Sequence, residues 1–143
     1  MNADVIDSPK VGLVGCGYWG KNLCRNFHAL GSLGLVVDST ESSQDKAKEL
    51  APGVPVNNSF EKVLEDDSIH AVALATPAET HAELSIKAMK AGKDVFVEKP
   101  MALTLEDAEA MRTVSEQTNR VLMVGHLLEY HPAVLRLREL IGS

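Results

Sequence analysis

Three glycines near the start of the chain have the spacing of a phosphate-binding turn. Gly15, Gly17 and Gly20 follow the apolar run 11–14 and precede a helical pattern. In such a turn the first glycine permits a sharp bend, the second leaves room for a pyrophosphate, and the third lets a helix pack closely on a strand. Free N–H groups at the start of the helix would then face the phosphates. This spacing predicts that the chain binds a dinucleotide.

An acidic residue further along the chain indicates which dinucleotide is bound. Asp38 ends the next apolar run, 34–38. A carboxylate in this place accepts hydrogen bonds from the adenosine ribose and repels a 2′-phosphate, so the predicted cofactor is NAD rather than NADP. Tyr18 and Trp19, which lie inside the glycine turn, are also expected to bind the cofactor. The alternative is a glycine-rich turn in some other α/β protein.

Polar side chains follow three further apolar runs. Thr76 and Pro77 come after the fourth run, Glu98 and Lys99 after the fifth, and His126 after the sixth. Ligands of parallel sheets bind outside the carboxyl ends of the strands, so we expect all of these residues on the nicotinamide side of one crevice. Lys99 is the candidate catalytic residue, because an ammonium group can hydrogen-bond a substrate hydroxyl and move its proton. His126 is a candidate for substrate binding.

His81 lies in the first turn of the helix that follows Thr76 and Pro77. A histidine in this position either lines the cofactor pocket or serves only to cap or pack the helix. The residue types and spacing leave both roles open. We include His81 among the candidate cofactor-binding residues.

Apolar runs and helical patterns alternate along the whole chain. This alternation is typical of the α/β class and predicts a doubly wound parallel sheet of six strands in the order 3-2-1-4-5-6. The expected strands are 11–14, 35–37, 54–56, 71–75, 94–97 and 121–124.

Two features of the expected helices can be predicted in more detail. In the helix 18–30, the side chains at 19, 23, 27 and 30 are spaced to form one buried stripe. Thr80 with Glu83, and Thr104 with Asp107, have the spacing of capping pairs at the starts of two later helices.

Composition excludes several classes of function. The chain has 143 residues, of which 45% are hydrophobic and 24% charged, and a net charge of −6. The acidic balance argues against nucleic acid as a partner, and no apolar run approaches the roughly 18 residues that a membrane span needs. Residues 1–10 lack the features of a secretory signal, so we expect a cytoplasmic protein. Cys16 and Cys24 have no metal-ligand spacing and are expected to be free thiols, with no bound metal.

The expected organisation is a disordered tail at 1–9, a dinucleotide-binding domain at 10–126, and the start of a connection to another domain at 127–143. The final helical pattern supports this division. Its apolar residues Val134, Leu137 and Leu140 have little remaining sequence to cover them. We therefore expect that a second, substrate-binding domain is missing from this chain.

Three segments of the chain resemble the N-terminal domain of the family of glucose-fructose oxidoreductase, inositol dehydrogenase and related dehydrogenases. The segments are 15–20, 75–81 and 91–100, and the likeness extends over about residues 9–142. Within the family, Tyr18-Trp19 and the stretch 125–132 are most similar to NAD-dependent dehydrogenases of UDP-linked amino sugars. These enzymes oxidise the 3-hydroxyl of UDP-N-acetylglucosamine or of its uronic acid.

The resemblance has several implications for the site and for the whole protein. It implies that Lys99 lies beside nicotinamide and substrate and that the Lys99–Pro100 peptide bond is cis. It also implies a second α/β domain that supplies the substrate pocket, an Asp-x-x-x-His catalytic motif and much of a homo-oligomer interface.

Two hypotheses follow for the function of the chain. In the first, it is the cofactor domain of an NAD-dependent sugar dehydrogenase, as an expressed fragment or a truncated gene product, which binds cofactor without turnover. In the second, it is a non-catalytic NAD-binding module such as a redox sensor or a partner subunit.

Overall fold

The computed structural model describes residues 9–142 and contains one parallel sheet of six strands. The predicted tail 1–9 lies outside the described residues, apart from its last residue. The strands are β1 (Lys10–Val14), β2 (Leu33–Val37), β3 (Val56–Asn57), β4 (Ile69–Leu74), β5 (Asp94–Val97) and β6 (Leu122–Val124). Their order is β3-β2-β1-β4-β5-β6, which confirms the predicted doubly wound topology.

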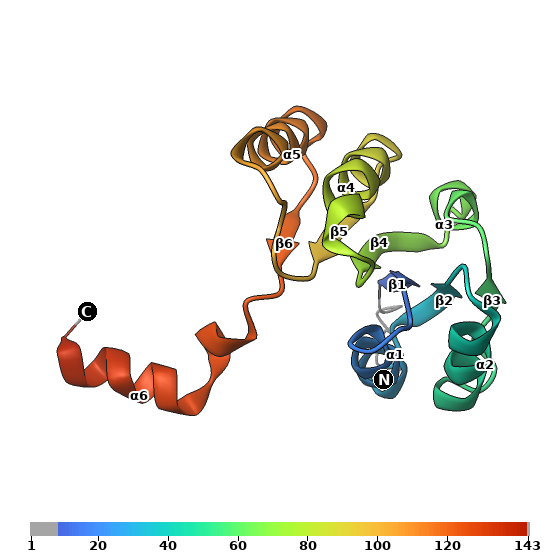
Figure 1. Ribbon diagram of the computed structural model, residues 1–143, viewed down its shortest axis with the longest axis horizontal. Helices are drawn as coiled ribbons and strands as arrows, with labels where there is room; N and C mark the ends of the chain where they lie inside the picture. Colours follow the sequence, from blue (N-terminus) through green and yellow to red (C-terminus); the bar gives the residue numbers. More distant parts are fainter. Residues whose placement is uncertain (1–8, 143) are drawn as a thin grey trace, which may run out of the picture.

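Helices cover both faces of this sheet. They are α1 (Gly20–Ala29), α2 (Glu41–Leu50), α3 (Glu61–Glu65), α4 (His81–Lys90), α5 (Leu105–Thr118) and α6 (Pro132–Ile141), with 3₁₀ turns η1 (Ala78–Thr80) and η2 (Leu127–Tyr130). Figure 1 shows α1 and α2 on one side of the sheet and α3, α4 and α5 on the other. Because all six strands are parallel, their carboxyl ends lie at one edge of the sheet, where the loops into the helices begin.

The strands bury apolar side chains on both faces, which explains their nearly continuous hydrophobic sequences. In β1, Leu13 packs in the cluster formed with α1 and α2, whereas Val14 packs in the cluster formed with α3, α4 and α5. In β4, Ala73 and Leu74 divide between the two clusters in the same way. The alternation divides the core into two layers, one on each face of the sheet.

The buried face of α1 differs from the predicted stripe. Leu23 and Phe27 pack against the core, but Trp19 is 41% exposed and Leu30 is 71% exposed. The stripe was wrong at both ends because the helix spans only Gly20–Ala29, so these two side chains lie beyond its termini. Cys24 is fully buried on the helix instead.

One of the two predicted helix caps is present. The Thr104 hydroxyl accepts a hydrogen bond from the Asp107 N–H at 3.1 Å, which confirms the cap of α5. The pairing of Thr80 with Glu83 was wrong. The Thr80 hydroxyl donates to the Pro77 carbonyl at 2.7 Å, because η1 precedes α4 and turns the hydroxyl back into the loop.

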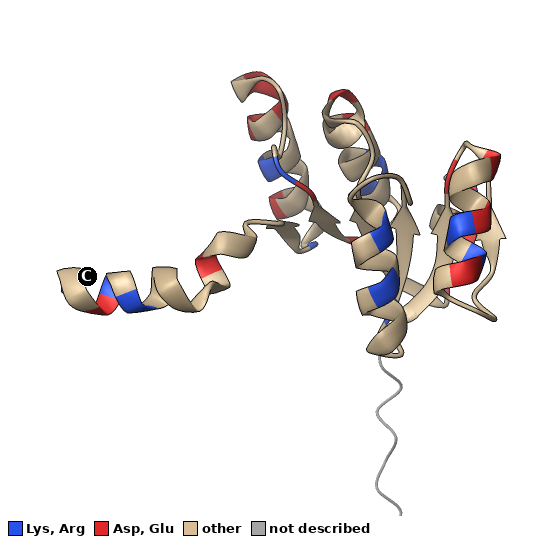
Figure 2. Ribbon diagram, turned by 60° about the horizontal axis from the view of Figure 1, so that its bottom comes forward, with Lys and Arg blue, Asp and Glu red and all other residues tan. Residues whose placement is uncertain are grey.

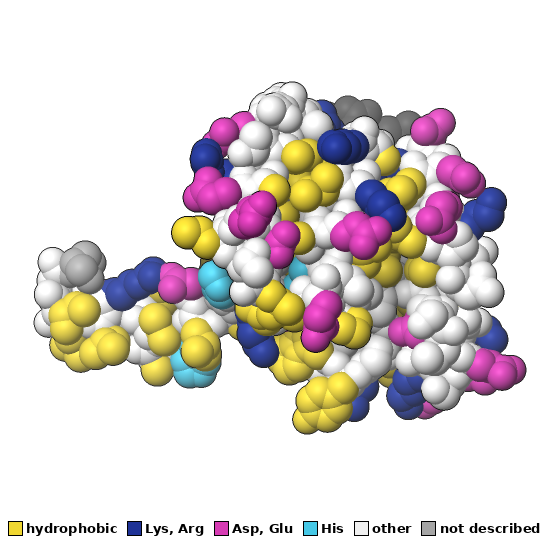
Figure 3. Space-filling model, turned by 45° about the horizontal axis from the view of Figure 1, so that its top comes forward, with side chains coloured by type: hydrophobic (Ala, Val, Ile, Leu, Met, Phe, Trp, Pro, Cys, Tyr) yellow, Lys and Arg dark blue, Asp and Glu magenta, His cyan; other side chains and the backbone are white. Residues whose placement is uncertain are grey.

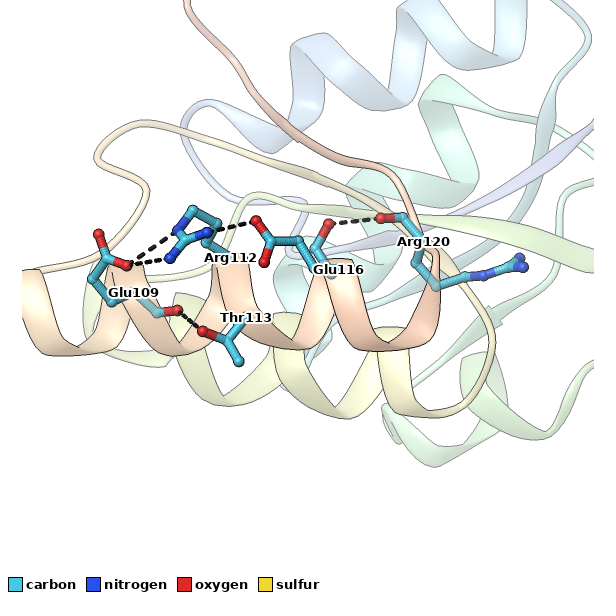
Figure 4. Close-up of polar contacts among 6 residues, drawn as sticks. Glu109, Arg112, Thr113, Glu116 and Arg120 are labelled. Carbon is cyan, nitrogen blue, oxygen red and sulfur yellow. Dashed lines mark hydrogen bonds and ion pairs between the residues drawn. The ribbon is translucent and has the colours of Figure 1, made fainter.

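The outer face of α5 is polar. Arg112 forms ion pairs with Glu109 at 2.9 Å and Glu116 at 2.5 Å, and Ser115 donates to the Arg120 carbonyl just beyond the helix (Figure 4). Such exposed i,i+3 and i,i+4 pairs support a helix locally. This face of the helix is directed to solvent.

Lys93 is a buried lysine with a structural position. It is 5% exposed, and its ammonium donates hydrogen bonds to the carbonyls of Asp66, at 2.7 Å, and Ile69, at 2.9 Å. These bonds join the turn before β5 to the start of β4, at the amino edge of the sheet. Lys93 thus fixes the position of β5, the strand that directly precedes Glu98.

Replacement of Lys93 by methionine is expected to destabilise the fold. The Lys93→Met variant leaves two carbonyls without their charged donor, which should lower the free energy of unfolding by about 2–4 kcal/mol. Urea denaturation followed by circular dichroism measures the change. Lys90→Met, at an exposed position of α4, is the control and should stay within about 0.5 kcal/mol of the parent. Equal stability of the two variants would contradict the structural role of Lys93.

The last helix, α6, projects away from the sheet (Figure 1). Apolar side chains gather along this projecting segment (Figure 3), and Leu137 and Leu140 are 56% and 67% exposed. The sequence predicted that Val134, Leu137 and Leu140 would all be uncovered. Leu137 and Leu140 are, whereas Val134 is partly buried.

The helices carry charged side chains on their surfaces. Figure 2 shows basic and acidic residues distributed over several helices, whereas α1 carries only the basic residues Lys21 and Arg25. Within residues 9–142, no helix combines the length and apolar character required to cross a bilayer.

Candidate cofactor site

The glycine turn joins β1 to α1 at the carboxyl edge of the sheet. Gly15 has a φ of +90°, and a Cβ there would lie 2.7 Å from the Ala75 carbonyl oxygen. A Cβ on Gly20 would lie 2.0 Å from the Gly15 carbonyl oxygen. Apart from its two chain neighbours, no described residue has an atom within 4 Å of the place that a Cβ on Gly17 would occupy. Gly15 and Gly20 are therefore required by the backbone itself, whereas Gly17 borders open space.

Asp38 is fixed to this turn. Its Oδ2 accepts a hydrogen bond from the Cys16 N–H at 2.7 Å, and its Oδ1 accepts from the backbone N–H and the hydroxyl of Thr40, both at 2.9 Å. The end of β2 and the loop after β1 are thus held together through one carboxylate. Asp38 remains accessible in the cleft above them.

A cleft of about 410 Å³ lies over the ends of β1, β2 and β4. Its lining includes the predicted residues Gly15, Gly17, Asp38, Thr76 and Pro77. Val14, Val37 and Ala75 at the strand ends line it as well, as do the loop and helix residues Ser39, Thr40, Ser43, Asn58 and Phe60. Sequence reasoning missed these five, although Ser39 and Thr40 directly follow a strand and the rule applied to the other strand ends would have found them.

A second cleft of about 740 Å³ lies over the ends of β5 and β6. Its lining residues are Trp19, Glu98, Lys99, Pro100, Gly125, His126, Leu127, Leu128 and Glu129. Lys99 is exposed, and the Lys99–Pro100 peptide bond is cis, as the family resemblance implies. Thr76 and Pro77 do not line this cleft. The three strand ends lie at one edge but are divided between two clefts, with the end of β4, which lies between β1 and β5, at the first of them.

Glu98 and Trp19 meet at the wall of the second cleft. Glu98 is 5% exposed, and its Oε1 accepts a hydrogen bond from the indole N–H of Trp19 at 2.7 Å. Trp19 belongs to the glycine turn, so this bond connects the phosphate-binding loop to the end of β5. Nothing in the local sequence around either residue indicated the contact.

His81 lies beneath the clefts and lines neither of them. Its side chain is 1% exposed, with Nε2 at 2.9 Å from the Thr76 carbonyl oxygen and Nδ1 at 2.8 Å from the Pro100 carbonyl oxygen. The position favours the structural one of its two predicted roles. It ties the loop after β4 to the loop that carries Lys99.

The two cysteines are free and buried, at 2% and 0% exposure. A hydrogen bond with the Cys24 thiol, together with burial, raises the pKa of the Cys16 thiol far above its usual range. The same hydrogen bond lowers the pKa of Cys24. Cys16 therefore stays protonated, and its contribution to the turn is the hydrogen bond from its backbone N–H to Asp38.

Asp66 and His70 have the Asp-x-x-x-His spacing but lie at the opposite edge of the sheet. Asp66 follows α3 and His70 is the second residue of β4, where its Nδ1 accepts a hydrogen bond from the Lys10 N–H. Both are remote from Lys99, so they cannot supply the catalytic pair that the family resemblance implies. Among residues 9–142 no cluster of His, Cys, Asp and Glu side chains has the arrangement of a metal site.

Comparison with known proteins places this chain in a family. Residues 9–126 match the model of the oxidoreductase family with an NAD-binding Rossmann fold, typified by glucose-fructose oxidoreductase and inositol dehydrogenase. The UDP-N-acetylglucosamine 3-dehydrogenase of Acidithiobacillus ferrooxidans is 31% identical over 132 residues, which cover 91% of this chain and 41% of that protein. An uncharacterized oxidoreductase of Streptococcus pneumoniae is 34% identical over 135 residues, covering 94% of this chain and 36% of that protein.

Solved structures agree with this assignment. The scyllo-inositol dehydrogenase of Lactobacillus casei, crystallised with NAD(H) and scyllo-inositol, superposes with a TM-score of 0.84 at 26% identity. The superposition covers 94% of this chain and 41% of that one. A 3-ketoreductase of Actinomadura kijaniata, crystallised with NADP and TDP-benzene, gives 0.84 at 25% identity over 94% of this chain and 42% of that one.

The chain thus spans about two-fifths of the length of these relatives. With its glycine turn, anchored acidic residue and two clefts along the carboxyl edge of the sheet, it belongs to the glucose-fructose oxidoreductase and inositol dehydrogenase family, as an NAD-binding Rossmann domain.

Proposed function

We propose that this chain is the cofactor domain of an NAD-dependent sugar dehydrogenase. The observation that carries the proposal is the arrangement of two adjoining clefts at the carboxyl edge, with the exposed amine of Lys99 at the second. The first cleft has the features of an adenosine and pyrophosphate site. The second, with an apolar wall of Leu127 and Leu128, suits nicotinamide and substrate.

Each half of the cofactor would be held by different residues. Asp38 would accept hydrogen bonds from the adenosine ribose, and the backbone at Gly17 and the start of α1 would bind the pyrophosphate. Glu98 would bind the nicotinamide ribose. NAD, when bound, is the hydride acceptor. Lys99 would hold the substrate hydroxyl and, with a basic group from outside these residues, remove its proton.

The substrate that we propose is a UDP-linked amino sugar or its uronic acid, oxidised at the 3-hydroxyl. The Acidithiobacillus relative carries this activity in its name, and the Actinomadura structure holds a TDP-linked ligand. His126, exposed in the second cleft, is the proposed substrate contact. We further propose a cytoplasmic location and homo-oligomers of the whole protein.

Preference for NAD over NADP tests the cofactor part of the proposal. Because Asp38 is anchored and accessible, we expect NADP(H) to bind more weakly than NAD(H) by roughly 1.5–3 kcal/mol, the range for hydrogen bonds to charged groups. Isothermal titration calorimetry with both cofactors measures the difference. The Asp38→Asn variant should show a smaller difference in binding free energy between NAD(H) and NADP(H).

The control for this experiment is Asp67→Asn, which makes the same change of charge at an exposed position at the opposite edge of the sheet. It should leave the NAD to NADP ratio unchanged. Equal or tighter binding of NADP by the parent chain would contradict the role of Asp38.

A further inference from the structure

The carboxylate of Glu98 is held by one oxygen only. Oε1 accepts the hydrogen bond from Trp19, and no donor in the described part of the chain reaches Oε2. Over residues 9–142, Ser85 Oγ is the sole buried side-chain oxygen or nitrogen that lacks a partner, so Oε2 is not sealed in the interior. Glu98 lines the second cleft, and Oε2 is therefore the oxygen available to a ligand there.

The end of β6 closes the other side of this carboxylate. A Cβ on Gly125 would lie 3.2 Å from Glu98 Oε1 and 3.0 Å from Phe96 Cζ. The carboxylate is thus confined between the indole of Trp19 and the backbone of Gly125. Rotation that turned both oxygens away from the indole would break the bond to Trp19 and leave a buried carboxylate without its donor, which is costly.

We propose that Trp19 is a positioning residue for Glu98. The indole has a single N–H donor, so it engages one carboxylate oxygen of Glu98 and leaves the other free to accept. With Oε1 fixed, Oε2 faces the second cleft and accepts hydrogen bonds from the vicinal hydroxyls of the nicotinamide ribose. This inference rests on the proposed function, in which Glu98 binds that ribose.

The exposure of Trp19 fits this role. The side chain is 41% exposed at the mouth of the site rather than packed in the core of α1. Its position inside the glycine turn also means that the phosphate-binding loop and the ribose-binding carboxylate form one connected unit.

Three ligands of increasing length separate this role from a general effect on the turn. ADP lacks the second ribose, ADP-ribose contains it, and NAD adds the nicotinamide. For Trp19→Phe, which keeps an aromatic ring but removes the donor, we expect ADP affinity within twofold of the parent and about tenfold weaker binding of ADP-ribose and NAD. Isothermal titration calorimetry gives all three dissociation constants.

Two further variants complete the design. In a Glu98→Ala background there is no carboxylate to position, so adding Trp19→Phe should weaken ADP-ribose binding by less than twofold. Tyr130→Phe, at an exposed aromatic outside both clefts, should leave every dissociation constant unchanged.

Trp19 is the only tryptophan of the chain, so its fluorescence reports on the bond directly. Glu98→Ala should shift the emission maximum, and this measurement does not depend on the folding of a Trp19 variant. An unchanged emission spectrum, or equal losses for ADP and ADP-ribose in Trp19→Phe, would overturn the inference. Failure of the parent chain to bind NAD at all would instead count against the proposed function.

Discussion

Gly17→Val is expected to abolish NAD binding and to leave the fold intact. Apart from the two chain neighbours of Gly17, no described atom lies within 4 Å of a Cβ at this position, so the added side chain begins in open space. The same empty space is where the proposed pyrophosphate approaches the backbone N–H groups. We expect the NAD dissociation constant to rise by at least about a hundredfold, because the valine side chain and the pyrophosphate cannot occupy the same volume. Calorimetric titration measures the loss, and circular dichroism checks the fold.

Gly20→Ala is the informative comparison. A Cβ on Gly20 would lie 2.0 Å from a backbone oxygen, so this smaller substitution should destabilise the fold as well as weaken NAD binding. The two glycines would then separate loss of binding from loss of structure. A folded Gly17→Val protein that binds NAD as the parent does would show that the phosphates lie elsewhere.

The sheet could be predicted from the sequence because its strands are buried on both faces. Each strand is then a short apolar run, and the helix after it has its own period, so type and order follow from the pattern. The weakest prediction was the third strand, expected at 54–56 and found as β3 at Val56–Asn57. Pro55 lies just before β3 and bonds to β2 through its carbonyl alone, since proline has no N–H to donate.

The sequence predicted which edge of the sheet carries the site, but not how the site residues divide between the two clefts. Residues after the strands do lie at one edge, yet sequence alone does not say how far apart two strand ends are across the sheet. Strand β4 lies between β1 and β5, and Thr76 at its end lines the first cleft, while β5 and β6 carry Glu98 and His126 to the second.

Long-range contacts account for the remaining differences. Trp19 and Glu98 are 79 residues apart, and their hydrogen bond exists only because α1 and β5 reach the same edge. His81 bridges two carbonyls that belong to different loops. Spacing rules describe one element at a time, so contacts of this kind lie outside what they can predict.

Lys99→Met is expected to remove sugar-dependent reduction of NAD while NAD binding changes by less than about threefold. The measurement requires a gene product in which residues 1–143 are joined to a substrate domain. There the Lys99 amine is the proposed partner of the reacting hydroxyl, and loss of a proton-transferring group lowers rates by about 10²–10⁴-fold. Absorbance of NADH at saturating NAD and UDP-amino sugar gives the rate, and Lys90→Met is the matched control.

The prediction depends on how Lys99 is held. The structure gives its amine no hydrogen bond or ion pair with any residue between 9 and 142, although the neighbouring Glu98 is buried and engaged by Trp19. Lys99 is therefore free to bind substrate rather than committed to the fold, and its removal should cost little stability. The same exposure means that the described residues alone do not exclude water from the reacting atoms, so residues 1–143 by themselves should show no measurable turnover. Full activity of Lys99→Met in the longer protein would refute the assignment of Lys99 as the catalytic group, whereas turnover by residues 1–143 alone would refute the need for further residues to exclude water.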